Sequence, residues 1–200
     1  MRIVGILLAA GRGSRFGGDK LLAPLVTPPP DIAAGTPIGI ASAIHLGRAL
    51  ARATAVLRPG HADLAARMRA AGLATIDCPN ADQGMGTTLS CGVSAAPDAD
   101  GWVVALADMP WITPVTIASV AAALAAGADI VAPAYRGRRG HPVGFTRRHR
   151  DALIASSGDA GARELIAANR AALTLLEVDD PGVLRDVDVP EDLSPPASLP

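Results

Sequence analysis

A chain of 200 residues, half of them hydrophobic and only five aromatic, has the size and composition of one globular domain and not of a disordered segment. Its 18 basic and 19 acidic residues give a formal net charge of -1, so there is no overall field to attract a nucleic-acid backbone or an anionic membrane. We therefore expect one domain over residues 1–193, a frayed proline-rich tail over 194–200, and no nucleic-acid or membrane partner.

The first apolar run and the two cysteines bear on the compartment. Residues 3–10 form a run that is short for a signal-peptide core, and residues 11–13 (Gly-Arg-Gly) stand where a small-residue cleavage site would be needed. No run approaches the roughly twenty apolar residues of a membrane span. Cys78 and Cys91 lack metal-ligand spacing and can form at most one disulfide, so reduced thiols are the simpler expectation. We expect a cytoplasmic protein.

Short apolar runs recur along the chain, and helical stretches separate most of them. The predicted strands cover residues 3–9, 54–57, 73–77, 102–106, 129–134 and 173–178. The predicted helices begin near residues 36, 62, 85, 113, 147 and 159. Thr36-Pro37 and Thr113-Pro114 each place an N-cap threonine before a proline at the first helical position. The alternation predicts an α/β, Rossmann-like domain: a mostly parallel twisted sheet with helices on both faces.

The predicted sheet indicates where a ligand would bind. In open parallel sheets, ligands lie beyond the carboxyl ends of the strands, at the point where the strand order switches. The loop over residues 26–35 contains Pro28-Pro29-Pro30 and cannot be a helix interior or a central strand. We expect this loop to fold over the surface near the site.

A glycine-rich segment directly follows the first predicted strand and reads Leu8-Ala9-Ala10-Gly11-Arg12-Gly13-Ser14-Arg15-Phe16-Gly17-Gly18-Asp19-Lys20. Glycines let backbone N–H groups crowd around an anion, and Arg15 and Lys20 add positive charge. Lys20 is the only lysine beside seventeen arginines, and its ammonium is a compact charge that a planar guanidinium does not replace. The segment predicts a phosphate-binding loop, with a tight solvent-facing turn as the alternative.

Aspartates follow another apolar run and recur near the end of the chain. Asp108 comes after the run 102–106, where its carboxylate would suit Mg²⁺, an ion that commonly takes one or two protein carboxylates. Asp186 and Asp188 lie on one face if that segment is extended. The alternatives are that Asp108 caps the turn before Pro110 and that Asp188 caps a following helix.

The glycine-rich segment is not a Walker A loop, because no Gly-Lys-Ser/Thr follows, and the third glycine of a dinucleotide fingerprint would fall at Phe16. Its pattern G-x-G-x-R-x-G-x-x-K resembles that of the MobA-like nucleotidyltransferases, most closely the molybdenum-cofactor cytidylyltransferases. The resemblance implies a single-domain Rossmann-like nucleotidyltransferase fold. It implies catalytic roles for Lys20, Arg15 and Asp108. It also implies a Mg²⁺ site on Asp108 and Asp188, with Asp186 as the second choice in place of Asp188.

Three further segments carry the same resemblance. Residues 84–89 resemble the family's G-M-x-x-S-L with Thr88 in place of serine, while residues 140–143 and 158–163 resemble its G-H-P-V and G-D-x-G-A-R signatures. The implied nucleotide-binding residues are Leu8, Ala9, Ala10, Gly11, Arg12, Gly13, Ser14, Gly17, Lys20, Asn80, Gly84 and Met85. The implied acceptor-binding residues are His141, Pro142, Asp159 and Arg163. Without the resemblance, residues 84–89 suit an ordinary capped helix and His141 suits a structural hydrogen-bonding group.

The resemblance implies transfer of CMP from CTP to the phosphate of molybdopterin, with release of pyrophosphate. In the resembled group an alanine at the position of Ala10 goes with cytidylyl transfer and a glycine with guanylyl transfer. GTP-dependent guanylyl transfer, nucleotidylyl transfer to a sugar phosphate or isoprenoid precursor, and a non-catalytic protein that binds or delivers molybdenum cofactor remain the alternatives. The expected partners are CTP or GTP, molybdopterin and a recipient molybdoenzyme.

Overall fold

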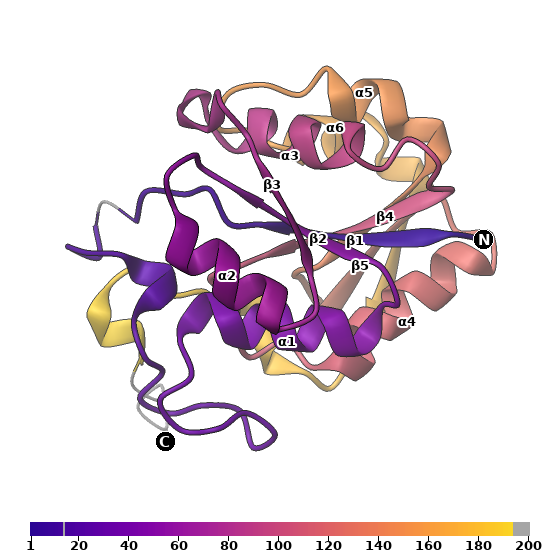
Figure 1. Ribbon diagram of the computed structural model, residues 1–200. Helices are drawn as coiled ribbons and strands as arrows, with labels where there is room; N and C mark the ends of the chain where they lie inside the picture. Colours follow the sequence, from indigo (N-terminus) through magenta and orange to yellow (C-terminus); the bar gives the residue numbers. More distant parts are fainter. Residues whose placement is uncertain (14, 194–200) are drawn as a thin grey trace.

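The computed structural model describes residues 1–13 and 15–193, so the predicted tail lies outside the described residues. One mixed sheet runs through the molecule (Figure 1). Its strands are β1 (Ile3–Leu8), β2 (Ala53–Leu57), β3 (Ala74–Asp77), β4 (Gly101–Leu106), β5 (Ile130–Tyr135), β6 (Arg138–Arg139), β7 (Val143–Thr146) and β8 (Leu173–Glu177). The α-helices are α1 (Ile38–Ala49), α2 (Ala62–Ala70), α3 (Met85–Ser94), α4 (Pro114–Ala125), α5 (Arg150–Ile154) and α6 (Arg163–Ala168). The 3-10 turns are η1 (Lys20–Leu22), η2 (Ala81–Gln83), η3 (Arg147–His149), η4 (Arg170–Ala172), η5 (Pro181–Leu184) and η6 (Pro190–Leu193).

The strand order is β3-β2-β1-β4-β7-β5-β6, and β8 also pairs with β5. Strands β1 to β4 run parallel, as do β5 and β8, whereas β7 is antiparallel to both of its neighbours and β6 to β5. The chain moves outward from β1 to β3 and then returns to place β4 on the other side of β1. The predicted mostly parallel sheet is confirmed, and its order switches between β1 and β4.

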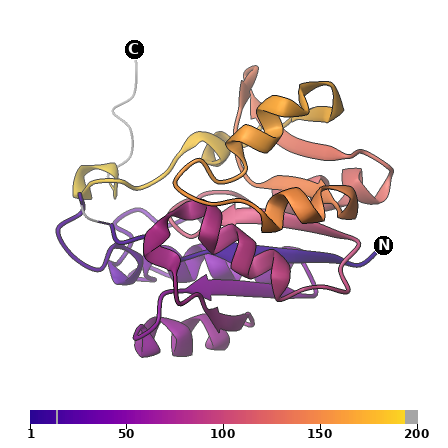
Figure 2. The same cartoon turned by 90° about the horizontal axis from the view of Figure 1, so that it is seen from above.

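Helices cover both faces of the sheet (Figures 1 and 2). Helices α1, α2 and α4 lie on one face, where they pack over alternate strand residues such as Leu7 and Val103. Helices α3, α5 and α6 cover the other face, where Ile6 and Val104 point. Successive strand residues thus enter opposite cores, which is why the central strands are continuous apolar runs in the sequence.

Two strands, β6 and β7, were not expected from the sequence. They span two and four residues, so neither shows the alternation by which a strand is usually found. Strand β7 fits between β4 and β5 because Gly144 lets α4 approach closely; a Cβ there would lie 2.9 Å from side-chain atoms of Leu124 and Val120. Its place in the sheet depends on this tertiary packing.

The predicted helix starts have mixed outcomes. At α4 the Thr113 side chain accepts a hydrogen bond from the Thr116 amide at 3.3 Å, so that cap is confirmed. At α1 the cap position belongs to Pro37 and no side chain caps the helix, so the expected cap by Thr36 is wrong. The Thr36 carbonyl instead accepts from the Leu25 amide, which holds Thr36 to the preceding loop.

The last predicted helix begins later than expected. Helix α6 starts at Arg163 and not near Asp159. Gly161 has a φ of 53°, a left-handed conformation that interrupts a helix, and the chain turns over these residues before α6 begins. The glycines of residues 158–163 therefore lie in a loop, and of this segment only Arg163 lies in the helix.

The proline-rich loop over residues 26–35 is anchored to the body. Trp111 donates a hydrogen bond from its indole to the Thr27 carbonyl, and Arg48 pairs with Asp31 at 2.7 Å. Ile32 is buried in a small third core that also contains Val187. The loop therefore packs beside the C-terminal segment that carries Asp186 and Asp188.

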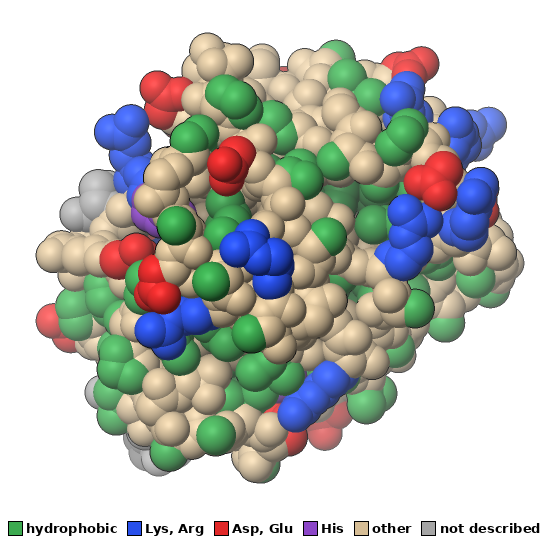
Figure 3. Space-filling view, viewed as in Figure 1, with side chains coloured by type: hydrophobic (Ala, Val, Ile, Leu, Met, Phe, Trp, Pro, Cys, Tyr) green, Lys and Arg blue, Asp and Glu red, His purple; other side chains and the backbone are tan. Residues whose placement is uncertain are grey.

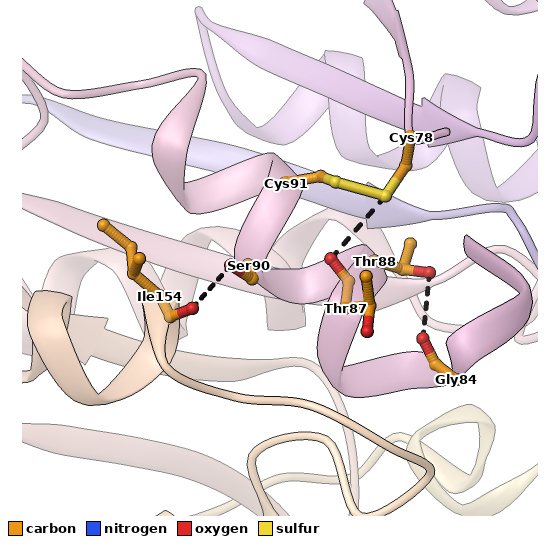
Figure 4. Close-up of a disulfide and its surroundings, with 7 residues drawn as sticks. All are labelled: Cys78, Gly84, Thr87, Thr88, Ser90, Cys91 and Ile154. Carbon is orange, nitrogen blue, oxygen red and sulfur yellow. Dashed lines mark hydrogen bonds between the residues drawn. A yellow bond between two sulfur atoms is a disulfide. The ribbon is translucent and has the colours of Figure 1, made fainter. Parts of the chain in front are cut away.

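The expectation of reduced thiols is wrong, because Cys78 and Cys91 form a disulfide (Figure 4). Cys78 follows β3, and Cys91 lies on α3, which folds back along the sheet. This return brings the two Cα atoms to 6.0 Å across a separation of 13 residues, within the usual range for a disulfide. The proximity arises from the path of the chain and is not visible in the cysteine spacing.

The charged side chains on the surface reflect the nearly equal numbers of acidic and basic residues in the sequence. Acidic and basic side chains are interspersed on the face shown in Figure 3. In the described part of the chain, no helix combines the length and apolar character that crossing a bilayer requires.

Candidate active site

The carboxyl ends of β1 and β4 meet at the switch in strand order. Leu8 and Leu106, the last residues of the two strands, are paired in register. The Ala107 amide still donates to the Leu8 carbonyl at 3.1 Å before the chains diverge. The glycine-rich segment and Asp108 therefore leave the sheet side by side, as the parallel pairing requires.

A cavity of about 330 Å³, here called the first cavity, opens at this point. Its walls come from the ends of β1 and β4, from η1, and from the segment that leads into α3. The lining residues are Leu8, Ala9, Ala10, Gly11, Arg12, Gly13, Lys20, Leu21, Ala81, Asp82, Gly84, Met85, Thr88, Leu106, Ala107, Asp108 and Asp159. The structure thus gathers most of the predicted nucleotide-binding residues around one space.

Lys20 lies at the centre of the charges in this cavity. Its Nζ is 2.8 Å from Oδ2 of Asp108 and 3.7 Å from Oδ1 of Asp188. The Lys20 and Asp108 side chains are only 11% and 26% exposed, respectively. The hydrogen bond that the structure gives to the Asp108 carboxylate comes from Lys20, so it does not support the alternative in which Asp108 caps the turn before Pro110.

Asp188 reaches the same place from the end of the chain. The Val187 amide donates to the Asp108 backbone carbonyl at 2.9 Å, which ties the two segments together. Asp192, and not Asp188, accepts the backbone amides at this turn, from Asp188 at 2.7 Å and Val189 at 2.9 Å. The helix-cap alternative for Asp188 is therefore wrong, and its carboxylate instead pairs with Arg15 at 2.9 Å and faces Lys20.

Asp186 is a third carboxylate near Asp108 and Asp188. Burial raises the pKa of Asp186, and the nearby carboxylates of Asp108 and Asp188 raise it further, partly offset by Lys20. Within residues 1–13 and 15–193, no three His, Cys, Asp or Glu side chains converge as a ready metal site. A pair of carboxylates already bridged by an ammonium is, however, a donor set that fits Mg²⁺, which needs only one or two protein ligands.

A second cavity of about 220 Å³ adjoins the first. It shares Leu8, Met85, Leu106 and Asp159 with the first cavity. The other residues that line it are Leu89, Val104, Arg139, His141, Val143, Phe145, Ala160, Gly161, Ala162, Arg163 and Ile166. Of the predicted acceptor-binding residues, His141, Asp159 and Arg163 line this space, while Pro142 is buried behind it after a cis peptide bond.

Hydrogen bonds and close backbone packing join the segments that line the two cavities. The Gly86 amide donates to the Gly158 carbonyl at 2.7 Å, and Ser90 donates to the Ile154 carbonyl at 2.6 Å (Figure 4). A Cβ on Gly84 would overlap the Gly158 carbonyl group. The turn into α3 and the loop before α6 can approach this closely only because Gly84 has no side chain.

Some predicted residues lie elsewhere, and some lining residues were missed. Asn80 and Gly17 are exposed and line neither cavity, and Ser14 lies outside the described residues. The lining residues missed by sequence analysis are Leu21, Ala81, Asp82, Thr88, Leu106, Ala107, Leu89, Val104, Arg139, Val143, Phe145, Ala160, Gly161, Ala162 and Ile166. Six of them lie in segments that had been singled out, namely Thr88, Leu89, Val143, Ala160, Gly161 and Ala162. Asp82 and Arg139 are charged, and the remaining side chains carry no chemical signal, so only the fold identifies them.

A glycine-rich loop, a lysine and an aspartate just beyond a strand end lie around one cavity at the switch in strand order, which is the arrangement expected of a nucleotide-binding transferase of the α/β class. A family model for the MobA-like NTP transferase domain matches residues 5–173. The chain belongs to the MobA-like family of nucleotidyltransferases.

Similar proteins cover nearly the whole chain. Purine catabolism protein PucB of Bacillus subtilis is 32% identical over 95% of this chain and 93% of its own length. Nicotine blue oxidoreductase of Paenarthrobacter nicotinovorans is 28% identical over 96% and 94%. Among solved structures, Rv0371c of Mycobacterium tuberculosis is 27% identical, with a TM-score of 0.75 over 96% of this chain and 95% of that one.

Proposed function

We propose that this enzyme transfers CMP from CTP to the phosphate of molybdopterin and releases pyrophosphate. The observation that carries the proposal is the Lys20–Asp108 pair, which lines the first cavity together with the glycine-rich loop, while a second cavity adjoins the first. The first cavity holds the nucleotide and the second holds the acceptor. The resemblance of residues 140–143 and 158–163 to cytidylyltransferase signatures favours this acceptor.

The lining of the first cavity combines basic groups, apolar side chains and the carboxylates of Asp82, Asp108 and Asp159. Arg12, Lys20 and the amides of the glycine-rich loop bind the triphosphate. The small or apolar side chains of Ala10, Ala81 and Met85 contact the base. With the triphosphate beside Lys20, the α-phosphorus is near Asp108, which pairs with that lysine.

The chemistry is an in-line displacement. An oxygen of the acceptor phosphate attacks the α-phosphorus, and the bond from that phosphorus to the bridging oxygen of the β-phosphate breaks, so pyrophosphate leaves with the electron pair. A phosphate monoester is already ionised at neutral pH, and no strong general base is needed. Repulsion between the anions is the main obstacle, and the Lys20 ammonium, Arg15 and the loop amides reduce it.

Asp108 and Asp188 are the residues that would hold Mg²⁺. When bound, the ion neutralises phosphate charge and orients the triphosphate. Asp108 and Asp188 lie close enough to Asp186 to affect its charge, and neighbouring carboxylates of this kind fit a site that takes up a divalent cation. The structurally similar Rv0371c has also been solved as a complex with manganese, which supports a divalent ion in this fold.

Ala10 supports CTP over GTP. Its side chain is 4% exposed and lines the first cavity, so its methyl group occupies space that a purine would need. One methyl group in a pocket is typically worth about 1 to 3 kcal/mol, which gives preference without strict exclusion. We therefore expect kcat/KM to favour CTP, and the CTP-to-GTP ratio to fall about five-fold or more in Ala10→Gly. An unchanged ratio, or a natural preference for GTP, would refute this choice of nucleotide.

The central experiment measures pyrophosphate release with CTP or GTP, Mg²⁺ and molybdopterin loaded with molybdenum. Equal amounts of pyrophosphate and of the nucleotide-linked cofactor are expected with CTP. Tight binding of the cofactor without pyrophosphate would indicate a binding or delivery protein that serves a recipient molybdoenzyme. Turnover with a sugar phosphate or an isoprenoid precursor, and none with molybdopterin, would reassign the acceptor.

A further inference from the structure

The disulfide between Cys78 and Cys91 closes a loop over residues 79–90, called here the disulfide loop. This loop contributes five lining residues to the first cavity and two to the second, and one residue belongs to both sets. They are Ala81, Asp82, Gly84, Met85 and Thr88 in the first cavity, and Met85 and Leu89 in the second. One covalent bond therefore joins the two ends of a segment that forms a wall of the nucleotide cavity.

The first half of the disulfide loop is tied to the rest of the protein mainly through its ends. In the described part of the chain, the hydrogen bonds of residues 79–84 all run within residues 78–88. The next hydrogen bond to another segment comes after this stretch, where the Gly86 amide donates to the Gly158 carbonyl at 2.7 Å. The position of this part of the cavity wall therefore depends on the bond that fixes Cys78 to α3.

The two cysteines differ in accessibility, and the buried one has a second polar neighbour. Cys78 is completely buried, whereas Cys91 on α3 is partly exposed. The Thr87 carbonyl oxygen lies 3.7 Å from Sγ of Cys78, so a free thiol at Cys78 can donate a hydrogen bond to it (Figure 4). A reductant can thus reach the bond from the side of Cys91, and the buried sulfur keeps a partner after the bond breaks.

We propose that the Cys78–Cys91 disulfide is a redox site that controls nucleotide binding in the first cavity, and that a dithiol reductant opens it. With the bond intact, the two ends of the disulfide loop are held together. Once the bond is broken, the loop gains conformational freedom, and it must lose this freedom again when nucleotide binds. Reduction therefore lowers the affinity for nucleotide. The inference rests on the proposed function for the identity of the nucleotide, and it adds a means of regulation.

The opening of the bond is a two-step thiol–disulfide exchange. One thiolate of the reductant attacks Sγ of Cys91, the S–S bond breaks, and Cys78 leaves with the electron pair and takes up a proton. The second thiolate of the reductant then attacks the reductant sulfur of the mixed disulfide, so Cys91 leaves and is protonated in turn. Two electrons pass to the protein, the two protons come from the thiols of the reductant, and the reductant becomes an intramolecular disulfide.

The first test measures nucleotide binding in the two redox states. Thiol titration in denaturant should find no free thiol in the natural protein prepared without reductant, and two after treatment with dithiothreitol. Calorimetry with Mg²⁺ then gives the dissociation constant of a non-hydrolysable CTP analogue at a temperature at which both forms are folded. This constant should be about five-fold or more higher for the reduced protein. Reoxidation should restore the original value.

The second test uses the reciprocity of linked equilibria. If reduction weakens nucleotide binding by some factor, saturating nucleotide must oppose reduction by the same factor. In mixtures of reduced and oxidised dithiothreitol, the ratio that reduces half of the protein should rise about five-fold or more when the analogue is added. A disulfide with a purely structural role would give the same ratio with and without nucleotide.

A substitution supplies the open form without reductant. Cys91→Ser should bind the analogue as weakly as the reduced natural protein does, and dithiothreitol should have no further effect on it. Ser94→Ala, at an exposed residue one turn further along α3, is the matched control and should keep both the tight binding and the response to dithiothreitol. If Cys91→Ser does not fold, the two redox states of the natural protein still decide the inference.

The inference and the proposed function fail in different ways. Equal affinity in the two redox states, an unchanged dithiothreitol ratio, or free thiols in protein prepared without reductant would each overturn the inference. If a GTP analogue binds in place of the CTP analogue, or if bound nucleotide is never transferred to molybdopterin, the proposed function is wrong, and the same measurements with the bound nucleotide decide the inference. If the oxidised protein binds neither analogue, both are wrong.

Discussion

Two ion pairs of nearly equal length differ in their surroundings. The Lys20–Asp108 pair spans 2.8 Å between side chains that are 11% and 26% exposed, whereas Arg15–Asp188 spans 2.9 Å between side chains that are 76% and 49% exposed. Exposed pairs typically contribute about 0 to 1 kcal/mol to stability and are screened by salt. Partly buried charges depend much more on keeping a partner. The inner pair therefore defines the site, while the outer pair can rearrange when substrates bind.

Loss of the Asp108 charge tests the inner pair most severely. Asp108→Asn removes one charge and little volume, and we expect kcat/KM to fall about 1000-fold, as for other groups that stabilise charge in a transition state. The melting temperature should change little, because Asp188 still faces Lys20 at 3.7 Å. Asp151→Asn, at a side chain that is 98% exposed, is the matched control and should retain full activity. Near-normal turnover of Asp108→Asn at saturating Mg²⁺ would contradict the assignment.

Replacement of Lys20 by another cationic residue should have the next largest effect on activity. Lys20→Arg keeps the charge, but a planar guanidinium does not fit the space of an ammonium that is 11% exposed, so we expect about a 100-fold loss of kcat. Lys20→Ala should also weaken binding of a non-hydrolysable CTP analogue in calorimetry. The exchange Arg67→Lys at the exposed pair with Asp63 should change neither quantity. Full activity of Lys20→Arg would mean that the identity of the cation is immaterial.

Substitutions of Asp186 and Asp188 test which of the two aspartates acts with the Lys20–Asp108 pair. Asp188 faces Lys20 and Asp186 does not pair with it directly, so Asp188→Asn should lower kcat/KM about 10-fold more than Asp186→Asn does. Titration of activity with Mg²⁺ should show a higher half-saturating concentration for Asp188→Asn. The reverse order of the two variants would assign the second metal ligand to Asp186.

Arg15 gives the smallest effect. Because its pair with Asp188 is largely exposed, Arg15→Ala should leave the melting temperature unchanged and lower kcat/KM only about five-fold. Added salt should lower the kcat/KM of the natural enzyme and so reduce the difference in kcat/KM between it and Arg15→Ala. A loss as large as that of Asp108→Asn would show that the outer pair is as essential as the inner one.

Sequence analysis could find the residues whose chemistry stands out from its surroundings. Lys20 is the only lysine and follows a glycine-rich turn, and Asp108 ends an apolar strand, so both were identified from local pattern. The packing between distant segments could not be read in this way. The disulfide between Cys78 and Cys91, the insertion of β7 between β4 and β5, and the apolar wall of the second cavity all depend on how the chain returns to the sheet.

The contact between the turn into α3 and the loop before α6 limits how this enzyme can be redesigned. Gly86 and Gly158 are joined backbone to backbone, and Gly84 has no room for a side chain, so there is no adaptable layer between the two segments. A loop grafted over residues 155–162 would displace the turn that lines the first cavity. Any change to the second cavity must therefore leave this backbone contact intact.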